Sequence, residues 1–157
     1  MKPEQKEIRP KDRYEKARDY HKRGFNCCQS VLASFTDLTG MSEQECFDIA
    51  GGFGAGAGTG ELCGAITGAA MTLGRLTPVD PADPVGSKKR TVALSKELQA
   101  KFSEKFGALR CQDLLGGGKF VPDERTPAAA RMGLTGHCDI MIVTAVEFVE
   151  EILNQRG

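Results

Sequence analysis

Apolar residues recur with a period of about 3.6 along almost the whole chain, and no segment shows the two-residue alternation of a β-strand. Glycines, prolines and capping residues divide this pattern into separate stretches. The expected helices are residues 11–23, 27–38, 42–50, 63–75, 88–106 and 140–153. The pattern therefore predicts an all-α fold, a compact bundle of five or six helices in one domain spanning residues 1–157, with residues 1–10 as a disordered tail.

Each expected helix carries an apolar stripe that we assign to the core. Leu38 continues the stripe of the second helix, and Gly40 is expected to cap that helix. Cys28 and Cys46 lie on such stripes, so we interpret both as buried apolar residues. The core candidates of the first, second and longest helices are Tyr14, Ala17, Tyr20, Val31, Leu32, Phe35, Leu38, Leu94, Leu98, Phe102 and Phe106.

Several connections are predicted between the helices. Residues 51–60 contain six glycines, which favour a loop whose backbone can approach a bound group closely. Residues 77–87 contain three prolines and are expected to form a surface connection, and residues 119–136 a long irregular segment. A short turn at residues 109–115 contains Cys111.

Composition narrows the functional classes. Lys plus Arg and Asp plus Glu both number 21, and tryptophan is absent, so neither nucleic acid nor an anionic membrane is an expected partner. Residues 1–14 are charged, and the longest apolar run, residues 62–74, is too short to cross a bilayer. We therefore expect a cytoplasmic protein without membrane insertion, in which cysteines serve as ligands or redox thiols rather than in disulfides. The sequence leaves open whether the protein forms a homodimer.

Four cysteines share a local setting. Cys27, Cys63 and Cys138 stand at the expected first turn of a helix, where free N–H groups and the helix dipole favour a thiolate. Cys111 precedes three consecutive glycines. We therefore assign Cys27, Cys63, Cys111 and Cys138 as candidate metal ligands, or as redox-active thiols if no cluster is bound. The choice between Cys27 and its neighbour Cys28 stays open.

The spacing of these cysteines bears on the kind of site. Structural zinc sites usually use cysteines only a few residues apart, so zinc is weakly supported, and there is no C-x-x-C-H motif for attached haem. An iron–sulfur cluster can use four scattered cysteines, and we favour [2Fe–2S] with a role in electron transfer. The candidate cofactor-binding residues, whose backbone could approach the cluster, are Gly54, Gly56, Gly58 and Gly64.

Other interpretations stay open. The same four cysteines, used in pairs, would suit a thiol–disulfide switch or oxidoreductase, and a helical interaction module with incidental cysteines is a third hypothesis. The segment Gly52-x-Gly54-x-x-Ala57 loosely matches a dinucleotide fingerprint but follows a helix instead of a strand. His137 is interpreted as a cap or surface residue. The sequence does not distinguish an electron carrier from an enzyme.

The cysteines lie in segments that resemble a known family. The segments are Gly24-Phe25-Asn26-Cys27, Gly51-Gly52-Phe53-Gly54, Cys63-Gly64-Ala65-x-x-Gly68, Phe106-Gly107 with Cys111, and a late Cys138. Over most of the chain they resemble the redox-active family named for its C, GCAxxG, C, C pattern, although the order here is Cys63-Gly64-Ala65 and not Gly-Cys-Ala.

The resemblance implies a redox-active protein that works with an unidentified redox partner protein. Its functional cysteines would be the same four, while Cys28 stands where the family commonly has alanine and Cys46 lies outside the pattern. Similar domains occur in split-Soret-type cytochromes, whose shared cysteines are associated with an iron–sulfur cluster. The resemblance therefore implies this cofactor here, without haem.

A single site places geometric demands on the fold. The helices that begin at Cys27, Cys63 and Cys138 should direct their N-termini to one point, with the Cys111 turn closing it. Four sulfurs that share a cluster should lie within about 7 Å of one another. The residues expected at a close contact between helices are Gly64 and Gly68.

Overall fold

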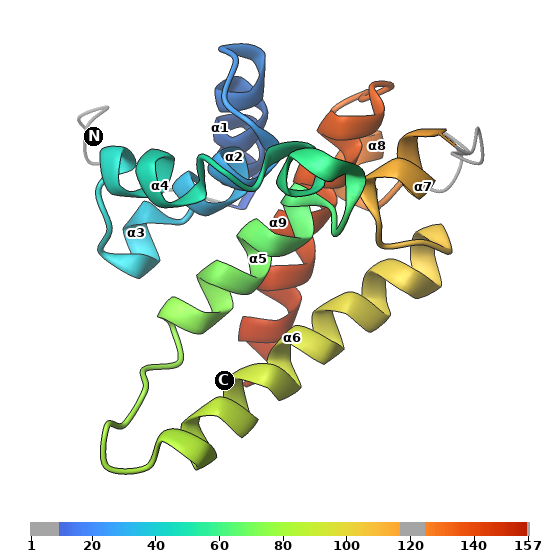
Figure 1. Ribbon diagram of the computed structural model, residues 1–157. Coiled ribbons are helices and arrows are strands. Elements are labelled where there is room, and N and C mark those ends of the chain that lie inside the picture. The colour runs from blue at the N-terminus through green and yellow to red at the C-terminus, as the bar shows by residue number, and fades with distance from the viewer. Residues whose placement is uncertain (1–9, 117–124, 157) are drawn as a thin grey trace.

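The computed structural model describes residues 10–116 and 125–156, and within these ranges the chain is helical and contains no β-strand (Figure 1). The helices are α1 (Pro10–Lys22), α2 (Cys27–Ala33), α3 (Thr36–Thr39), α4 (Glu43–Ala50), the π-type turn η2 (Gly56–Gly60), α5 (Gly64–Arg75), α6 (Pro84–Phe106), α7 (Cys111–Gly116), α8 (Pro127–Arg131) and α9 (His137–Gln155). The predicted all-α fold is confirmed. Six of the described helices have seven or more residues.

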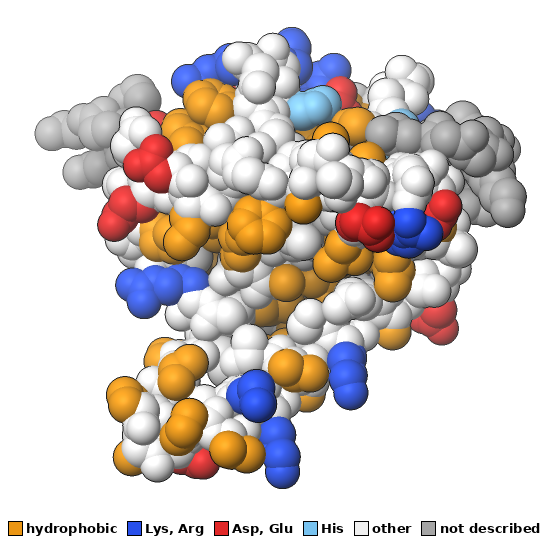
Figure 2. Space-filling view, viewed as in Figure 1, with side chains coloured by type: hydrophobic (Ala, Val, Ile, Leu, Met, Phe, Trp, Pro, Cys, Tyr) orange, Lys and Arg blue, Asp and Glu red, His pale blue; other side chains and the backbone are white. Residues whose placement is uncertain are grey.

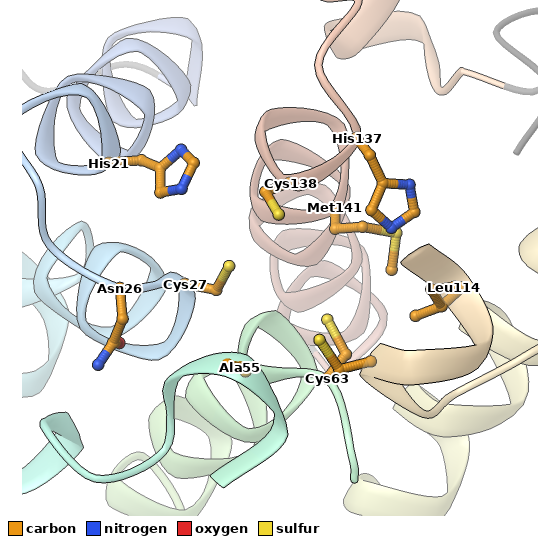
Figure 3. Close-up of a pocket in the computed structure, with 11 residues that line it drawn as sticks. His21, Asn26, Cys27, Ala55, Cys63, Leu114, His137, Cys138 and Met141 are labelled. Atoms are coloured by element: carbon orange, nitrogen blue, oxygen red, sulfur yellow. The ribbon is translucent and has the colours of Figure 1, made fainter. Parts of the chain in front are cut away.

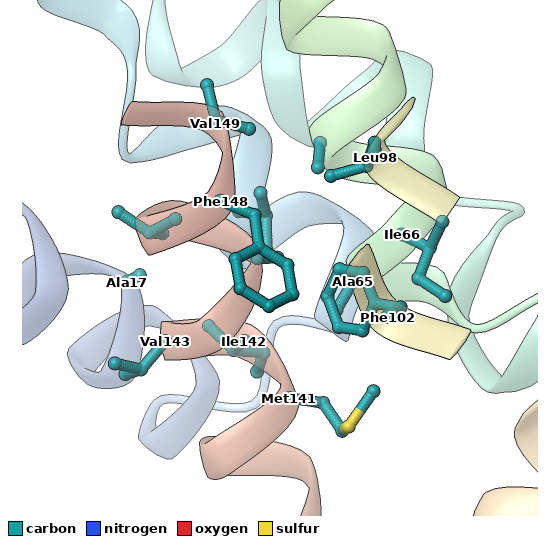
Figure 4. Packing of buried hydrophobic residues seen from close by; sticks show 14 of the residues in the cluster. Ala17, Ala65, Ile66, Leu98, Phe102, Met141, Ile142, Val143, Phe148 and Val149 are labelled. Atoms are coloured by element: carbon teal, nitrogen blue, oxygen red, sulfur yellow. The ribbon is translucent and has the colours of Figure 1, made fainter. Parts of the chain in front are cut away.

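Helix α9 is the central element of the fold. It packs against α1, α2, α5, α6 and α8, and its residues from Ile140 to Val149 are all buried (Figure 1). A helix that is apolar on nearly every side requires such a central position. The main core forms around it, with the rings of Phe102 and Phe148 in edge-to-face contact at 5.0 Å (Figure 4).

A second, smaller core lies where α1, α2 and α4 meet. Tyr20, Cys28 and Cys46 are buried there, and Cys28 Sγ lies 3.7 Å from Met71 Sδ. Both cysteines therefore pack as apolar residues, as the sequence predicts.

The predicted helix over residues 27–38 is wrong, because the chain divides it into α2 and α3. The break lies at Ser34, whose carbonyl accepts a hydrogen bond from Nε of the buried Arg13 at 3.2 Å instead of from an amide one turn later. This turn redirects Leu38, a predicted core residue, which is 46% exposed. Gly40 ends α3 in the left-handed conformation (φ 72°), as expected.

Other elements also differ from the sequence prediction, and α9 begins at His137, three residues before the predicted start. Helix α6 begins at Pro84, inside the predicted connection, because Asp83 caps it by accepting from the Gly86 amide at 3.0 Å and proline suits a first turn. Helix α7 replaces the predicted turn at Cys111, and α8, capped by Thr126, occupies part of the predicted irregular segment. The rest of that segment up to residue 124, and the predicted tail up to residue 9, lie outside the described residues.

The prediction of a close contact at Gly64 and Gly68 is confirmed at the packing of α5 on α2. A Cβ on Gly68 would lie 2.8 Å from the carbonyl oxygen of Cys28, and one on Gly64 would lie 3.2 Å from the Cβ of Cys27. The two helices can approach this closely only because these positions lack side chains.

Exposed apolar side chains gather at the end of the molecule formed by the α5–α6 connection and the first turns of α6 (Figure 2). Val79, Val85 and Val92 are 63%, 57% and 43% exposed there. No helix in the described ranges has the length and apolar character that crossing a membrane requires.

Candidate functional site

The four predicted cysteines line one cavity of about 230 Å³ (Figure 3). Each stands at the start of a helix: Cys27 begins α2, Cys63 directly precedes α5, Cys111 begins α7, and Cys138 is the second residue of α9. Cys63 is 6% exposed, and the other three are half-buried. The structure thus brings together cysteines that are far apart in the sequence, while their role as ligands stays a prediction.

Backbone hydrogen bonds hold Cys63 beside Cys111. The amide of Cys63 donates to the carbonyl of Leu109 at 2.9 Å, and the amide of Cys111 donates to the carbonyl of Glu61 at 2.6 Å. These bonds flank an isolated antiparallel bridge between Leu62 and Arg110. One side of the cavity is therefore formed where residues 61–63 pair with residues 109–111. Neither segment has a sequence pattern that predicts this pairing.

Cys27 and Cys138 form a second group with His21, from the last turn of α1. One ligand atom of each, the two Sγ atoms and a ring nitrogen, all lie within 4.8 Å of one another, and the two sulfurs face each other (Figure 3). His21 Nδ1 is hydrogen-bonded to Asp139 Oδ1 at 2.8 Å. The sequence pattern did not single out His21. The one feature that could have drawn attention to it is that histidine is rare in this chain, which has two.

The second histidine, His137, also lies at the cavity. It was interpreted from the sequence as a cap or surface residue, but it is half-buried, lines the cavity, and follows Gly136, which occupies the N-cap position of α9. Burial lowers the pKa of its imidazole. Both histidines of the chain therefore belong to the surroundings of the four cysteines.

The pKa values of the Cys27 and Cys138 thiols are shifted in opposite directions. Interaction with the Cys27 thiol, helped by the nearby His21, lowers the pKa of Cys138 to about 6 against the opposing effect of burial. The same interaction, together with burial, raises the pKa of Cys27. Of the two thiols, Cys138 therefore loses its proton more readily than Cys27.

The other two thiols are harder to ionise. Burial raises the pKa of Cys63 to about 11, although the backbone amides of Ala65 and Ile66 oppose this rise. Burial, followed by the charge of Cys138, raises the pKa of Cys111. Each further thiolate in the cavity is thus disfavoured by burial and by the neighbouring cysteines, and a bound cation would offset that penalty because metal ligation deprotonates thiols.

The glycine-rich segment forms a tight turn beside the cavity. Four consecutive residues, from Ala55 to Gly58, have positive φ, which is strained for the two alanines among them. Of the predicted cofactor-binding glycines, Gly64 lines the cavity, whereas Gly54 packs on Asn26 and Gly56 on the backbone of Glu61. The fourth, Gly58, faces open space, and Ala55 is the residue of this turn that lines the cavity.

Residues 25–152 match the model of the family described as "Putative redox-active protein (C_GCAxxG_C_C)". No curated protein and no solved structure matches the chain. The matched region contains all four cysteines of the cavity and most of the described fold. The chain therefore belongs to the C_GCAxxG_C_C family of redox-active proteins.

Proposed function

We propose that the protein binds an iron–sulfur cluster, most simply [2Fe–2S], through Cys27, Cys63, Cys111 and Cys138, and passes electrons to a redox partner protein. The observation that carries the proposal is the convergence of these four thiols, from four helix starts, on one cavity. Four thiolates are the donor set that such clusters use most often.

The arrangement of the thiols suits two metal ions better than one. Cys27 and Cys138 face each other on one side, and the backbone pairing of residues 61–63 with 109–111 holds Cys63 and Cys111 as a second pair. Each iron of a [2Fe–2S] cluster takes two protein ligands, so two pairs meet that requirement. A single tetrahedral zinc ion would instead need all four sulfurs around one point.

When bound, the cluster would supply a site that takes up and releases single electrons. The chain's own residues would hold and shield it. The backbone amides of Ala65 and Ile66 favour the thiolate form of Cys63. Leu114 and Met141 line the cavity with apolar atoms and limit the access of water.

The decisive experiment is anaerobic purification followed by reconstitution with iron and sulfide. We expect a brown protein with equal amounts of iron and acid-labile sulfide, which gains an electron paramagnetic resonance signal on one-electron reduction. Replacing any one of the four cysteines by serine should reduce the iron content, whereas the controls Cys28→Ala and Cys46→Ala should keep it. Folded protein that takes up neither iron nor sulfide would rule the proposal out.

A second candidate function is thiol–disulfide exchange, favoured by the close approach of Cys27 and Cys138 sulfurs. The thiolate of Cys138 would attack a disulfide of a partner protein, form a mixed disulfide and release one partner thiolate. Cys27, after losing its proton, would then attack the Cys138 sulfur, closing the Cys27–Cys138 disulfide and releasing the second partner thiolate. The partner is reduced by two electrons, and the Cys27–Cys138 pair is oxidised by two.

Mass spectrometry separates this function from cluster binding. After treatment of metal-free protein with a small disulfide, we expect a Cys27–Cys138 disulfide, and Cys27→Ser should trap the mixed disulfide at Cys138. Cys46→Ser is the control. If metal-free protein forms no disulfide between these two residues, thiol–disulfide exchange at this pair is excluded.

A further inference from the structure

The strongest additional feature of the cavity is the group formed by His21, Cys27 and Cys138 with Asp139 behind the histidine. We propose that His21 is a metal ligand, and that it forms with Cys27 and Cys138 a three-ligand site for a divalent cation of the zinc, iron or cobalt type. The proposal rests on the proposed function only in treating Cys27 and Cys138 as metal ligands. It requires neither sulfide nor Cys63 and Cys111.

The distances fit such a site. The three ligand atoms lie within 4.8 Å of one another. In a tetrahedral site with thiolate and imidazole ligands, bond lengths place neighbouring ligand atoms about 3.5 to 3.8 Å apart. Small side-chain rotations would bring the three atoms to that separation. Imidazole and thiolate together are the donors that zinc and related metal ions prefer.

Asp139 prepares His21 for this role. Its Oδ1 lies 2.8 Å from His21 Nδ1, and because a carboxylate accepts hydrogen bonds, this contact would favour a proton on Nδ1 and metal binding through Nε2. The other carboxylate oxygen, Oδ2, lies 3.7 Å from Nε of Arg18. A carboxylate that accepts a hydrogen bond from a metal-bound histidine is the common arrangement around such ligands.

The charges at this end of the cavity also favour a divalent cation. Two thiolates, Cys27 and Cys138, would neutralise a doubly charged ion, and an imidazole that binds a metal through Nε2 adds no charge. Arg18 balances the carboxylate of Asp139. The metal would join α1, α2 and α9, three helices that already pack against one another.

The proposal can be tested with Co²⁺ alone, added anaerobically and without sulfide to the reduced, metal-free full-length chain. We expect one equivalent to bind with the sulfur-to-cobalt and d–d absorption bands of a tetrahedral thiolate site. His21→Asn should weaken binding at least about tenfold and alter the bands, and Asp139→Asn should weaken it by about ten- to a hundredfold. The control is Cys46→Ala, which changes a buried cysteine of the second core that does not line the cavity, and it should leave affinity and bands unchanged.

A second measurement avoids variants that fold poorly. With histidine labelled by ¹⁵N, Zn²⁺ should shift the Nε2 resonance of His21 strongly, while Nδ1 keeps its proton. Unchanged Co²⁺ binding in His21→Asn, with loss instead in Cys63→Ala and Cys111→Ala, would overturn the proposal, as would an unmoved Nε2 resonance.

The iron and sulfide contents of the same variants, measured after reconstitution, report separately on the cluster. Co²⁺ binding that depends on His21, in a chain that takes up no iron or sulfide, would support this site and reject the cluster.

Discussion

The amide of Cys63 donates a hydrogen bond to the carbonyl of Leu109 at 2.9 Å, which ties the start of α5 to the loop before α7. A second hydrogen bond runs in the opposite direction, from the amide of Cys111 to the carbonyl of Glu61. Together the two bonds hold two cysteines that are distant in the sequence next to each other. The side chains of Glu61 and Arg110 also form an ion pair across this pairing, at 3.1 Å, but both are about half exposed. The backbone and not the ion pair should therefore hold this side of the site together.

We predict that Arg110→Ala lowers the free energy of unfolding by at most about 1 kcal/mol, because exposed ion pairs contribute little. Glu61→Ala should have an effect of similar size. Neither change should reduce the metal content of reconstituted protein, since the hydrogen bonds at Cys63 and Cys111 come from the backbone. Urea unfolding and metal analysis check this, and a large loss of metal in either variant would contradict it.

The close packing of α5 on α2 predicts that Gly68→Ala is destabilising by about 1 to 3 kcal/mol, because the new Cβ would overlap the carbonyl oxygen of Cys28 at 2.8 Å. Gly74→Ala, in the same helix, is the control. Its Cβ would meet only Thr91 Cγ2 at 3.7 Å, so alanine should instead stabilise the helix by about 0.5 to 1 kcal/mol. Chemical denaturation of both variants measures the difference, and equal effects would refute this account of the contact.

Arg13 is predicted to be important for stability because its buried guanidinium binds three partners. It donates to the Ser34 carbonyl at 3.2 Å and to Glu150 Oε2 at 2.6 Å, and it pairs with Asp37. Arg13→Ala should lower the free energy of unfolding by about 3 kcal/mol, since it leaves partly buried acceptors without a donor. Arg13→Lys should recover little, because one ammonium cannot replace the planar fork.

The control for this experiment is Arg23→Ala, which removes an exposed arginine whose ion pair with Asp19 spans 3.8 Å. Its guanidinium also lies 5.6 and 5.3 Å from the centres of the Tyr20 and Phe25 rings, so its removal should lower the free energy of unfolding by about 1 kcal/mol, well below the loss expected for Arg13→Ala. If urea denaturation gives similar values for Arg13→Ala and Arg23→Ala, the buried network does not carry the stability assigned to it.

From the pKa shifts of the cysteines we predict how the free energy of unfolding of metal-free, reduced protein depends on pH. The pKa of Cys138 falls from 9.0 to about 6 on folding, so between these values the folded chain binds fewer protons than the unfolded chain. The contribution of Cys138 to stability therefore grows as pH rises from 6 to 9 and is lost as pH falls through 6. The pKa of Cys63 rises from 9.0 to about 11, so its contribution is present below pH 9 and lost as pH rises towards 11.

Alkylation followed by peptide mass spectrometry measures these pKa values directly. Cys138 should be modified with a midpoint near pH 6, whereas Cys63 should stay unreactive until far more alkaline pH. In Cys138→Ala the rise of stability between pH 6 and 9 should flatten. A Cys138 that titrates near the ordinary thiol pKa would contradict the interaction with Cys27.

Much of the helical framework could be predicted from the sequence because its causes are local. Periodicity located α1, α5 and α9, and capping residues located the ends of helices, as at Ser42 and Gly40. The positions of Cys27, Cys63 and Cys138 at helix starts could also be predicted, since glycines and cap residues act within one turn. Cys111 is different, because the sequence predicts a turn there and the structure has the start of α7. The pair Gly64 and Gly68 indicated a close contact because small residues at this spacing lie on the same side of a helix.

Only the tertiary structure decided how these pieces form a site. The break between α2 and α3 depends on Arg13, which lies 21 residues before the carbonyl that it binds. His21 reaches the cavity because α1 packs on α9, and its partner Asp139 is 118 residues away. The pairing that sets Cys63 beside Cys111 joins two short loop segments with no strand pattern. Periodicity and caps encode interactions within a few turns, whereas these contacts depend on how whole helices pack, which no local pattern specifies.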